Sequence, residues 1–135
     1  DKLTGKYKVG VIGAVGDRRD QDLINIGKLA ASMFDEIIIR QDKDLRGRTT
    51  EEIETLVLHG INQVSEKKVK MIPSEIEALE YVFKTARKDY FITICSDNIN
   101  EVINTVLKHK EEETRAEMLK ENFIWNSEKF NFIRY

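Results

Sequence analysis

The sequence predicts an α/β fold of the Rossmann-like type, a three-layer sandwich with a mostly parallel sheet and β-α repeating order. Three observations predict it: four short apolar runs rich in β-branched residues, helical segments with an apolar stripe, and helix-start signals before three of those segments. Because the apolar residues of each run are nearly continuous, we expect strands that are covered on both faces. All 135 residues are interpreted as one domain that ends in an extended C-terminal helix.

The first half of the chain alternates strand and helix twice. The first strand is expected over Val9 to Val15, and the first helix from about Asp20. The second strand is expected over Glu36 to Arg40. The second helix begins after Thr49, which forms a capping box with Glu52. Right-handed crossovers between parallel neighbours then place helices on the faces of the sheet.

The second half repeats the alternation. The third strand is expected over Val69 to Ile72 and the fourth over Tyr90 to Cys95. Helix-start pairs precede the two helices that follow: Ser74 with Glu77, and Asn98 with Glu101. Each strand therefore hands over to a helix within a few residues, as expected for a parallel sheet.

Residues 109–135 differ from the rest of the chain. The helical pattern loses its apolar stripe there, so we expect a charged helix that projects into solvent, followed by an aromatic tail. The tail either docks onto its own domain, the favoured interpretation, or offers a partner surface. Its aromatic residues are Phe123, Trp125, Phe130, Phe132 and Tyr135.

Composition excludes several classes of protein. Lys plus Arg total 22 against 24 Asp plus Glu, for a formal charge of −2, with 41% hydrophobic residues and no apolar run long enough to cross a bilayer. This balance argues against duplex nucleic acid and membranes as partners. We expect a cytoplasmic protein.

The sulfur and imidazole groups are too few for a metal cage, so no metal site is predicted. Cys95 is the one cysteine and is expected to be a buried thiol. His59 and His109 fall on helical segments as expected surface residues. None of the three stands in a nucleophile–base pattern.

The loop after the first strand holds two glycines and a charged turn. Gly13 and Gly16 would let backbone approach a ligand, and the turn Asp17-Arg18-Arg19-Asp20 stands at a helix N-terminus, which attracts anions. The alternative, favoured for such a turn taken alone, is an aspartate cap plus a surface ion pair. The glycine spacing is not the dinucleotide fingerprint, and no P-loop motif occurs in the sequence.

The loop after the second strand is denser still in charge. Arg46 and Arg48 flank a glycine and suit two-pronged recognition of carboxylate or phosphate, while Asp42 and Asp44 suit a metal or a cationic ligand. A solvated loop with a helix cap explains the same residues. Both loops follow parallel strands, so they should open on the same edge of the sheet, where ligands of such folds bind.

Three stretches carry a family resemblance: Val9-Gly10-Val11-Ile12-Gly13-Ala14-Val15-Gly16-Asp17-Arg18-Arg19-Asp20, Met33-Phe34-Asp35-Glu36-Ile37-Ile38-Ile39-Arg40, and Asp42-Lys43-Asp44-Leu45-Arg46-Gly47-Arg48. Together they resemble the C-terminal domain of the Mur ligase family, and most closely its cyanophycin synthetase branch. The resemblance runs from about Lys8 to Lys108, and the Asp-Leu-Arg-Gly-Arg stretch is its most specific part.

The resemblance implies an ATP-dependent ligase that forms amide bonds. In that family a central domain carries the P-loop, and the C-terminal domain closes over it. A carboxylate is activated as an acyl phosphate and an amine then attacks; in the cyanophycin branch, arginine is joined to the side chains of a poly-aspartate backbone. The resemblance thus implies ATP and Mg²⁺ as cofactors of the full-length enzyme. None is expected to bind tightly to this domain alone, because the P-loop is missing from it.

Site residues follow from the resemblance by position. Asp17, Arg18 and Asp20 match the family's Gly-Asp-Arg-x-Asp turn, which faces the nucleotide phosphate and the acceptor. Asp42 stands where peptidoglycan ligases begin the Asp-Asn-Pro-Arg motif that binds the incoming amino acid. Arg18 and Asp17 are the implied catalytic residues. The implied substrate- and nucleotide-binding residues are Gly13, Gly16, Arg19, Asp20, Asp42, Asp44, Arg46 and Arg48.

The implied partners are the central P-loop domain of the same polypeptide and the amino-acid and polypeptide substrates, with a homo-oligomer left open. The chain begins with Asp1 rather than Met, so we expect a piece of a longer ligase. The alternative function is a non-catalytic Rossmann-like module, binding or regulatory, that recognises a small anionic ligand.

Overall fold

The chain folds into a parallel sheet with helices between its strands. The computed structural model describes residues 5–14 and 16–129, with the backbone course alone for residues 122–129. The elements are β1 (Tyr7–Gly13), α1 (Asp20–Met33), β2 (Glu36–Arg40), α2 (Thr50–Asn62), β3 (Lys68–Ile72), α3 (Glu75–Thr85), β4 (Tyr90–Ile94) and α4 (Ile99–Lys129). The predicted α/β fold is confirmed. The end of the first expected strand, Val15, and the tail residues 130–135 lie outside the described part of the chain.

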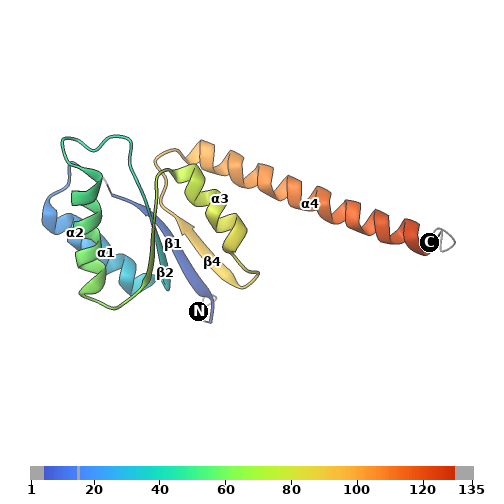
Figure 1. Ribbon diagram of the computed structural model, residues 1–135, viewed down its shortest axis with the longest axis horizontal. Coiled ribbons are helices and arrows are strands. Elements are labelled where there is room, and N and C mark those ends of the chain that lie inside the picture. The colour runs from blue at the N-terminus through green and yellow to red at the C-terminus, as the bar shows by residue number, and fades with distance from the viewer. Residues whose placement is uncertain (1–4, 15, 130–135) are drawn as a thin grey trace. The chain divides into compact units, whose positions relative to one another are not determined.

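The sheet has the strand order β3-β2-β1-β4, and every pairing in it is parallel. Figure 1 shows α1 and α2 together on one side of the sheet, while α3 lies on the other. Side chains alternate between these two layers: Ile37 and Ile39 face α1 and α2, whereas Ile38 faces α3. The first 97 residues form one compact unit, and residues 98–135, which contain α4, form a second.

Side-chain caps mark the starts of α2 and α3. The Thr49 hydroxyl accepts a hydrogen bond from the Glu52 amide at 3.2 Å, and the Glu52 carboxylate accepts from the Thr49 amide at 2.9 Å, so the predicted capping box is confirmed. Ser74 caps α3 by accepting from the Glu77 amide at 3.2 Å. These hydrogen bonds satisfy amides that the first turn of a helix leaves without partners.

The edge strands differ from the expectation of complete burial. All five residues of β2 are buried, but in β3 only Ile72 is buried, and β4 contains no fully buried residue. The reason is position: an edge strand has a neighbour on one side only. Continuous apolar runs therefore predicted the strands correctly, and their burial wrongly for the two edge strands.

Two glycines bring α1 and α2 into backbone contact. A Cβ atom added at Gly27 would overlap the carbonyl oxygen of Val57, and one added at Gly60 would overlap that of Ile24. Such an approach is open only to residues without a side chain. The pair of helices thus packs as one layer over the sheet.

Replacing Gly60 by alanine should lower the free energy of unfolding by about 1 to 3 kcal/mol, because a methyl group there cannot fit without a backbone shift. Urea denaturation measures this loss. Thr55→Ala, at an exposed position of the same helix, is the matched control and should change stability by less than about 0.5 kcal/mol. Equal stability of Gly60→Ala and the parent would show that the helices have room to separate.

A polar cluster stands at the amino ends of the strands. The buried Glu36 carboxylate accepts from the Lys68 ammonium at 3.1 Å and lies 3.5 Å from the Tyr7 hydroxyl. Burial, and next the charge of Glu36, raises the pKa of Tyr7 above its ordinary 10.0. The hydrogen bond to Glu36 raises the pKa of Lys68 above its ordinary 10.5.

Stability should therefore fall as the pH rises past 10.0, because the unfolded chain releases these two protons before the folded protein does. Below that pH both states hold the protons, and these groups add no pH dependence. Urea midpoints of Tyr7→Phe, measured below and above pH 10.0, should decline less steeply than those of the parent. Identical slopes would mean that Tyr7 titrates alike in both states.

Among the described residues, no helix has the length and apolar character that a bilayer crossing requires.

Candidate functional site

Two loops meet at the carboxyl edge of the sheet. The β1 loop (residues 14 and 16–19) follows β1 and the β2 loop (residues 41–49) follows β2; these neighbouring parallel strands end at the paired residues Gly13 and Arg40. A Cβ atom at Gly16 would overlap the carbonyl oxygen of Leu45, so the loops touch backbone to backbone. Gly16, which was expected to let a ligand approach the backbone, thus faces the other loop.

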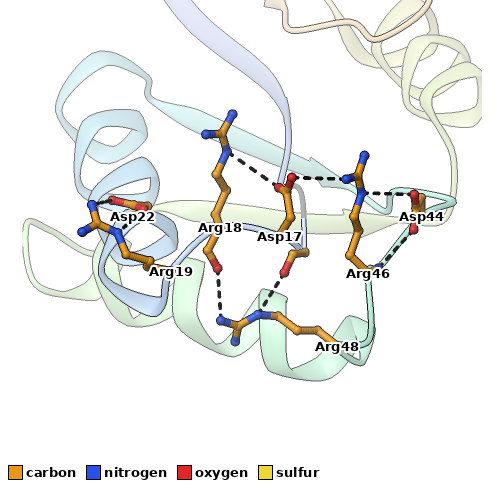
Figure 2. A network of polar contacts seen from close by, with 8 residues as sticks. Asp17, Arg18, Arg19, Asp22, Asp44, Arg46 and Arg48 are labelled. Carbon is orange, nitrogen blue, oxygen red and sulfur yellow. Dashed lines mark hydrogen bonds and ion pairs between the residues drawn. The ribbon is translucent and has the colours of Figure 1, made fainter.

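Asp17 joins two exposed arginines, one from each loop. Its Oδ1 lies 3.9 Å from Nε of Arg18, and its Oδ2 lies 3.5 Å from Nη1 of Arg46. Figure 2 shows Arg18 and Arg46 on either side of Asp17. The Arg18 side chain is 63% exposed and that of Arg46 is 55% exposed. One carboxylate therefore holds two accessible guanidinium groups near each other.

The β2 loop bends so that Arg46 can reach Asp17. Arg46 has a φ of 48°, a left-handed conformation that costs energy for a residue with a side chain. Asp44 supports it: its Oδ1 accepts from the Arg46 amide at 3.1 Å, and its Oδ2 lies 3.2 Å from Arg46 Nε. Asp42 in turn accepts from the Asp44 amide at 3.4 Å. Gly47 continues the turn at a φ of 86°.

Arg48 binds the backbone of the opposite loop. Its Nε donates to the Gly16 carbonyl at 3.1 Å, and its Nη2 donates to the Arg18 carbonyl at 3.1 Å. The same Nη2 lies 2.6 Å from Asp20 Oδ1, and the side chain is 26% exposed. Its guanidinium turns toward these backbone groups in Figure 2. The Arg48 guanidinium thus has three acceptors within the protein: two backbone carbonyls and one carboxylate.

Arg19 turns away from this group toward its own helix. It donates twice to Asp22, at 2.9 and 3.0 Å, and this hydrogen bond holds the pKa of the Asp22 carboxyl below its ordinary value. Arg19 is also the N-cap of α1 and makes no side-chain cap bond. The expectation that an aspartate caps this helix is therefore wrong: Asp20 is the first helical residue and accepts from Arg48 instead.

A cluster around the buried Arg40 stands beside these loops and was not predicted from the sequence. Arg40, at the end of β2, pairs with Glu75 of α3 and with Asp97, which follows β4. A Cβ atom at Gly13 would lie 2.7 Å from Arg40 Cζ, so the open side of that glycine is filled by the guanidinium. The sequence held one signal of this cluster: the apolar run of β2 ends in a charged residue, Arg40, and the neighbouring strand β1 ends in a glycine, Gly13.

Cys95 and the histidines stand as follows. Cys95 is exposed, which corrects the expectation of a buried thiol: it comes after the last paired residue of the edge strand β4. His59 lies exposed on α2, as expected, and His109 of α4 lies 3.2 Å from Glu113. Within the described part of the chain, no three His, Cys, Asp or Glu side chains are grouped so that they could hold a metal ion.

Taken together, the two loops present guanidinium donors of the kind that recognise anions. Arg18 and Arg46 present accessible guanidinium donors, and Arg forms paired hydrogen bonds with carboxylates and phosphates. Beside them an open groove follows the start of α2, with three carboxylates and one guanidinium in its lining: Asp20, Arg48, Thr49, Glu51, Glu52, Thr55 and Leu56. The acidic character of that groove suits the cationic end of a ligand whose anionic end meets the arginines.

Comparison with known proteins shows one kind of relative. No protein-family model matches the chain. The chain is 37% identical over 100 residues to a cyanophycin synthetase of Crocosphaera subtropica, a match over 73% of the chain. It is 34% and 33% identical over 104 residues to those of Trichormus variabilis and a Synechocystis species, over 76% of the chain. The chain spans 12% of the length of each of these relatives.

Proposed function

We propose that this chain is the Rossmann-like, Mur-type C-terminal domain of an ATP-dependent amino-acid ligase, a cyanophycin synthetase. The complete enzyme would join arginine to the aspartate side chains of a poly-aspartate backbone through an acyl phosphate. The observation that carries the proposal is 33–37% identity to cyanophycin synthetases over about three quarters of the chain. The arrangement of the two loops at one edge of the sheet supports it, because ligands of such sheets bind there.

In this proposal the two loops supply positive charge to a site that another domain completes. Arg18 meets the negative charge that develops on the acyl phosphate, and Asp17 orients it. Arg46 offers a second guanidinium, from the β2 loop, to the carboxylate of the incoming amino acid. The partner is a central domain of the same polypeptide that carries the P-loop, and the amino acid and the polypeptide are the substrates.

The described residues fit part of what ATP and Mg²⁺ require. ATP supplies the phosphoryl group that activates the carboxylate, and the exposed guanidinium of Arg18 suits one of its phosphates. Mg²⁺ prefers carboxylate oxygens and water. The nearby carboxylates Asp17, Asp20 and Asp44 each face an arginine, so they do not fit a magnesium site. We assign the ion to the partner domain.

Two measurements test the proposal. The 135-residue chain by itself should hydrolyse no ATP and should bind Mg-ATP weakly, because positioning of the triphosphate supplies most of phosphoryl-transfer catalysis. The complete polypeptide should release phosphate only when arginine and an aspartate polymer are both present, and should extend the polymer by arginine. Submicromolar Mg-ATP binding by the chain alone, or a complete polypeptide that binds phosphate and forms no amide, would favour the anion-binding alternative.

In the complete ligase, Arg46→Lys should raise the KM for the amino acid several-fold and leave kcat nearly unchanged, since lysine cannot form the paired hydrogen bonds of a guanidinium. Asp44→Asn should weaken the preference for arginine over citrulline, because it removes a negative charge beside the expected guanidinium of the substrate. Steady-state kinetics with arginine, lysine and citrulline measure both effects. Lys43→Gln, in the same loop, is the control. Unchanged KM and preference in both variants would place the amino-acid site elsewhere.

A further inference from the structure

Arg40 is buried at the edge of the sheet where exposed charge would be expected. Its side chain is 6% exposed, although it ends β2 beside the two charged loops. The residue paired with it on β1 is Gly13, and a Cβ atom there would lie 2.7 Å from Arg40 Cζ. Arg40 therefore reaches across the end of β1, through space that a glycine leaves open.

The Arg40 guanidinium ends at the loop that follows β4. Its Nη2 lies 2.7 Å from Asp97 Oδ2 and 3.4 Å from the Cys95 carbonyl oxygen. Its Nε lies 3.2 Å from Glu75 Oε1, an ion pair outside hydrogen-bond geometry. The other oxygen of Glu75 accepts from the Ser96 hydroxyl at 3.0 Å. Three consecutive residues of this loop are thus held by one arginine and its carboxylate partner.

The loop concerned lies at the point where the strand order reverses. Two parallel strands flank β1: β2, which leads on to β3, and β4 on the other side. In open α/β sheets, ligands bind outside the carboxyl ends of the strands at this reversal. The residues that Arg40 holds, Cys95 to Asp97, follow β4 there, next to the β1 loop.

Burial of the Arg40 guanidinium makes it costly to leave the charge of that group unpaired. A guanidinium removed from water needs partners for its charge, and here they are Glu75, whose side chain is 13% exposed, and Asp97, 61% exposed. Loss of the arginine would leave the Glu75 carboxylate without its cation. An apolar residue at the end of β2 would have avoided the electrostatic cost of burying a charge. We therefore assign the ion pairs of Arg40 to the placement of residues 95–97.

We infer that Arg40 is a positioning residue: with Glu75 it fixes residues 95–97 beside the β1 loop, so that they form a third wall of the ligand-binding edge. This inference rests on the proposed function for the identity of the ligand. The placement of the loop does not depend on it. Arg40 acts through Asp97 and the Cys95 carbonyl and touches no substrate.

Amide hydrogen exchange of the 135-residue chain, followed by NMR, tests the placement. In Arg40→Lys and Asp97→Asn the Cys95 amide, which donates to the Val11 carbonyl at 2.9 Å, should exchange about tenfold faster, the scale of losing one charged hydrogen bond. In Arg40→Ala, millimolar guanidinium chloride should restore slow exchange by filling the vacated position. Arg87→Lys, at an exposed position, is the control. Unchanged exchange in both Arg40→Lys and Asp97→Asn would overturn the inference.

Kinetics of the complete ligase test whether residues 95–97 form a wall of the ligand-binding edge. Asp97→Asn should raise the KM of ATP or of the amino acid several-fold while kcat falls less, because the loop shapes the site and performs no chemistry. Faster exchange with unchanged kinetic constants would overturn the claim of a third wall. If the complete polypeptide forms no amide bond, the proposed function fails, and the exchange rates still decide whether Arg40 positions the loop.

Discussion

In the complete ligase, Arg18→Ala should lower kcat by about 10²-fold or more, the scale on which one preorganised electrostatic contact to a transition state acts. The Arg18 guanidinium is 63% exposed, and its nearest described carboxylate atom, Asp17 Oδ1, is 3.9 Å away. It is therefore accessible to charge that develops on a transferring phosphoryl group. Steady-state turnover measures the effect.

Stability separates this role from a structural one. An exposed ion pair contributes at most about 1 kcal/mol, so the urea midpoint of Arg18→Ala should stay close to that of the parent. Arg87→Ala, which removes an exposed arginine from the turn before β4, controls for loss of charge. A kcat equal to that of the parent would make Arg18 a surface ion-pair residue.

Arg48→Ala should destabilise the chain by about 1 to 3 kcal/mol, because its guanidinium is bonded to the Gly16 and Arg18 carbonyls and to Asp20. Arg46→Ala, two residues away in the same loop, should cost less than about 0.5 kcal/mol, since its side chain is 55% exposed. Urea denaturation of both variants compares them directly.

The same pair should differ in the complete ligase. Without Arg48 the β1 loop loses its support, so Arg48→Ala should lower kcat as well as raise KM, whereas Arg46→Ala should act mainly on KM. Arg48→Lys keeps the charge and cannot reach three acceptors, so we expect it to restore little. Equal stability losses for Arg46→Ala and Arg48→Ala would show that the two arginines play the same part.

The fold could be predicted because its signals are local. A capping box such as Thr49 with Glu52 fixes a helix start within one turn, and an apolar run such as Ile37 to Ile39 marks a central strand without knowledge of its neighbours. Burial of the edge strands and of Cys95 depends on which strand ends the sheet. That property belongs to the whole topology, and the sequence pattern does not contain it.

The meeting of the two loops was predictable, and the contacts of their side chains were much less so. Parallel strands put both loops at one edge, which brought Asp17, Arg18 and Arg46 together. The sequence could not show that Arg48 serves the backbone, since the groups it bonds to are 28 to 32 residues away along the chain. The contact between Arg40 and Asp97 spans 57 residues. Local charge pattern cannot distinguish such long-range partners.

The glycine contact between α1 and α2 bears on how the site can move. Both helices begin at the ends of the charged loops, and Gly27 and Gly60 seat their backbones against each other without intervening side chains. Packed backbone yields little, so a displacement of one loop carries the other with it. The two loops are then expected to move as one rigid unit. A hinge that opens or closes the site should lie outside the α1–α2 pair.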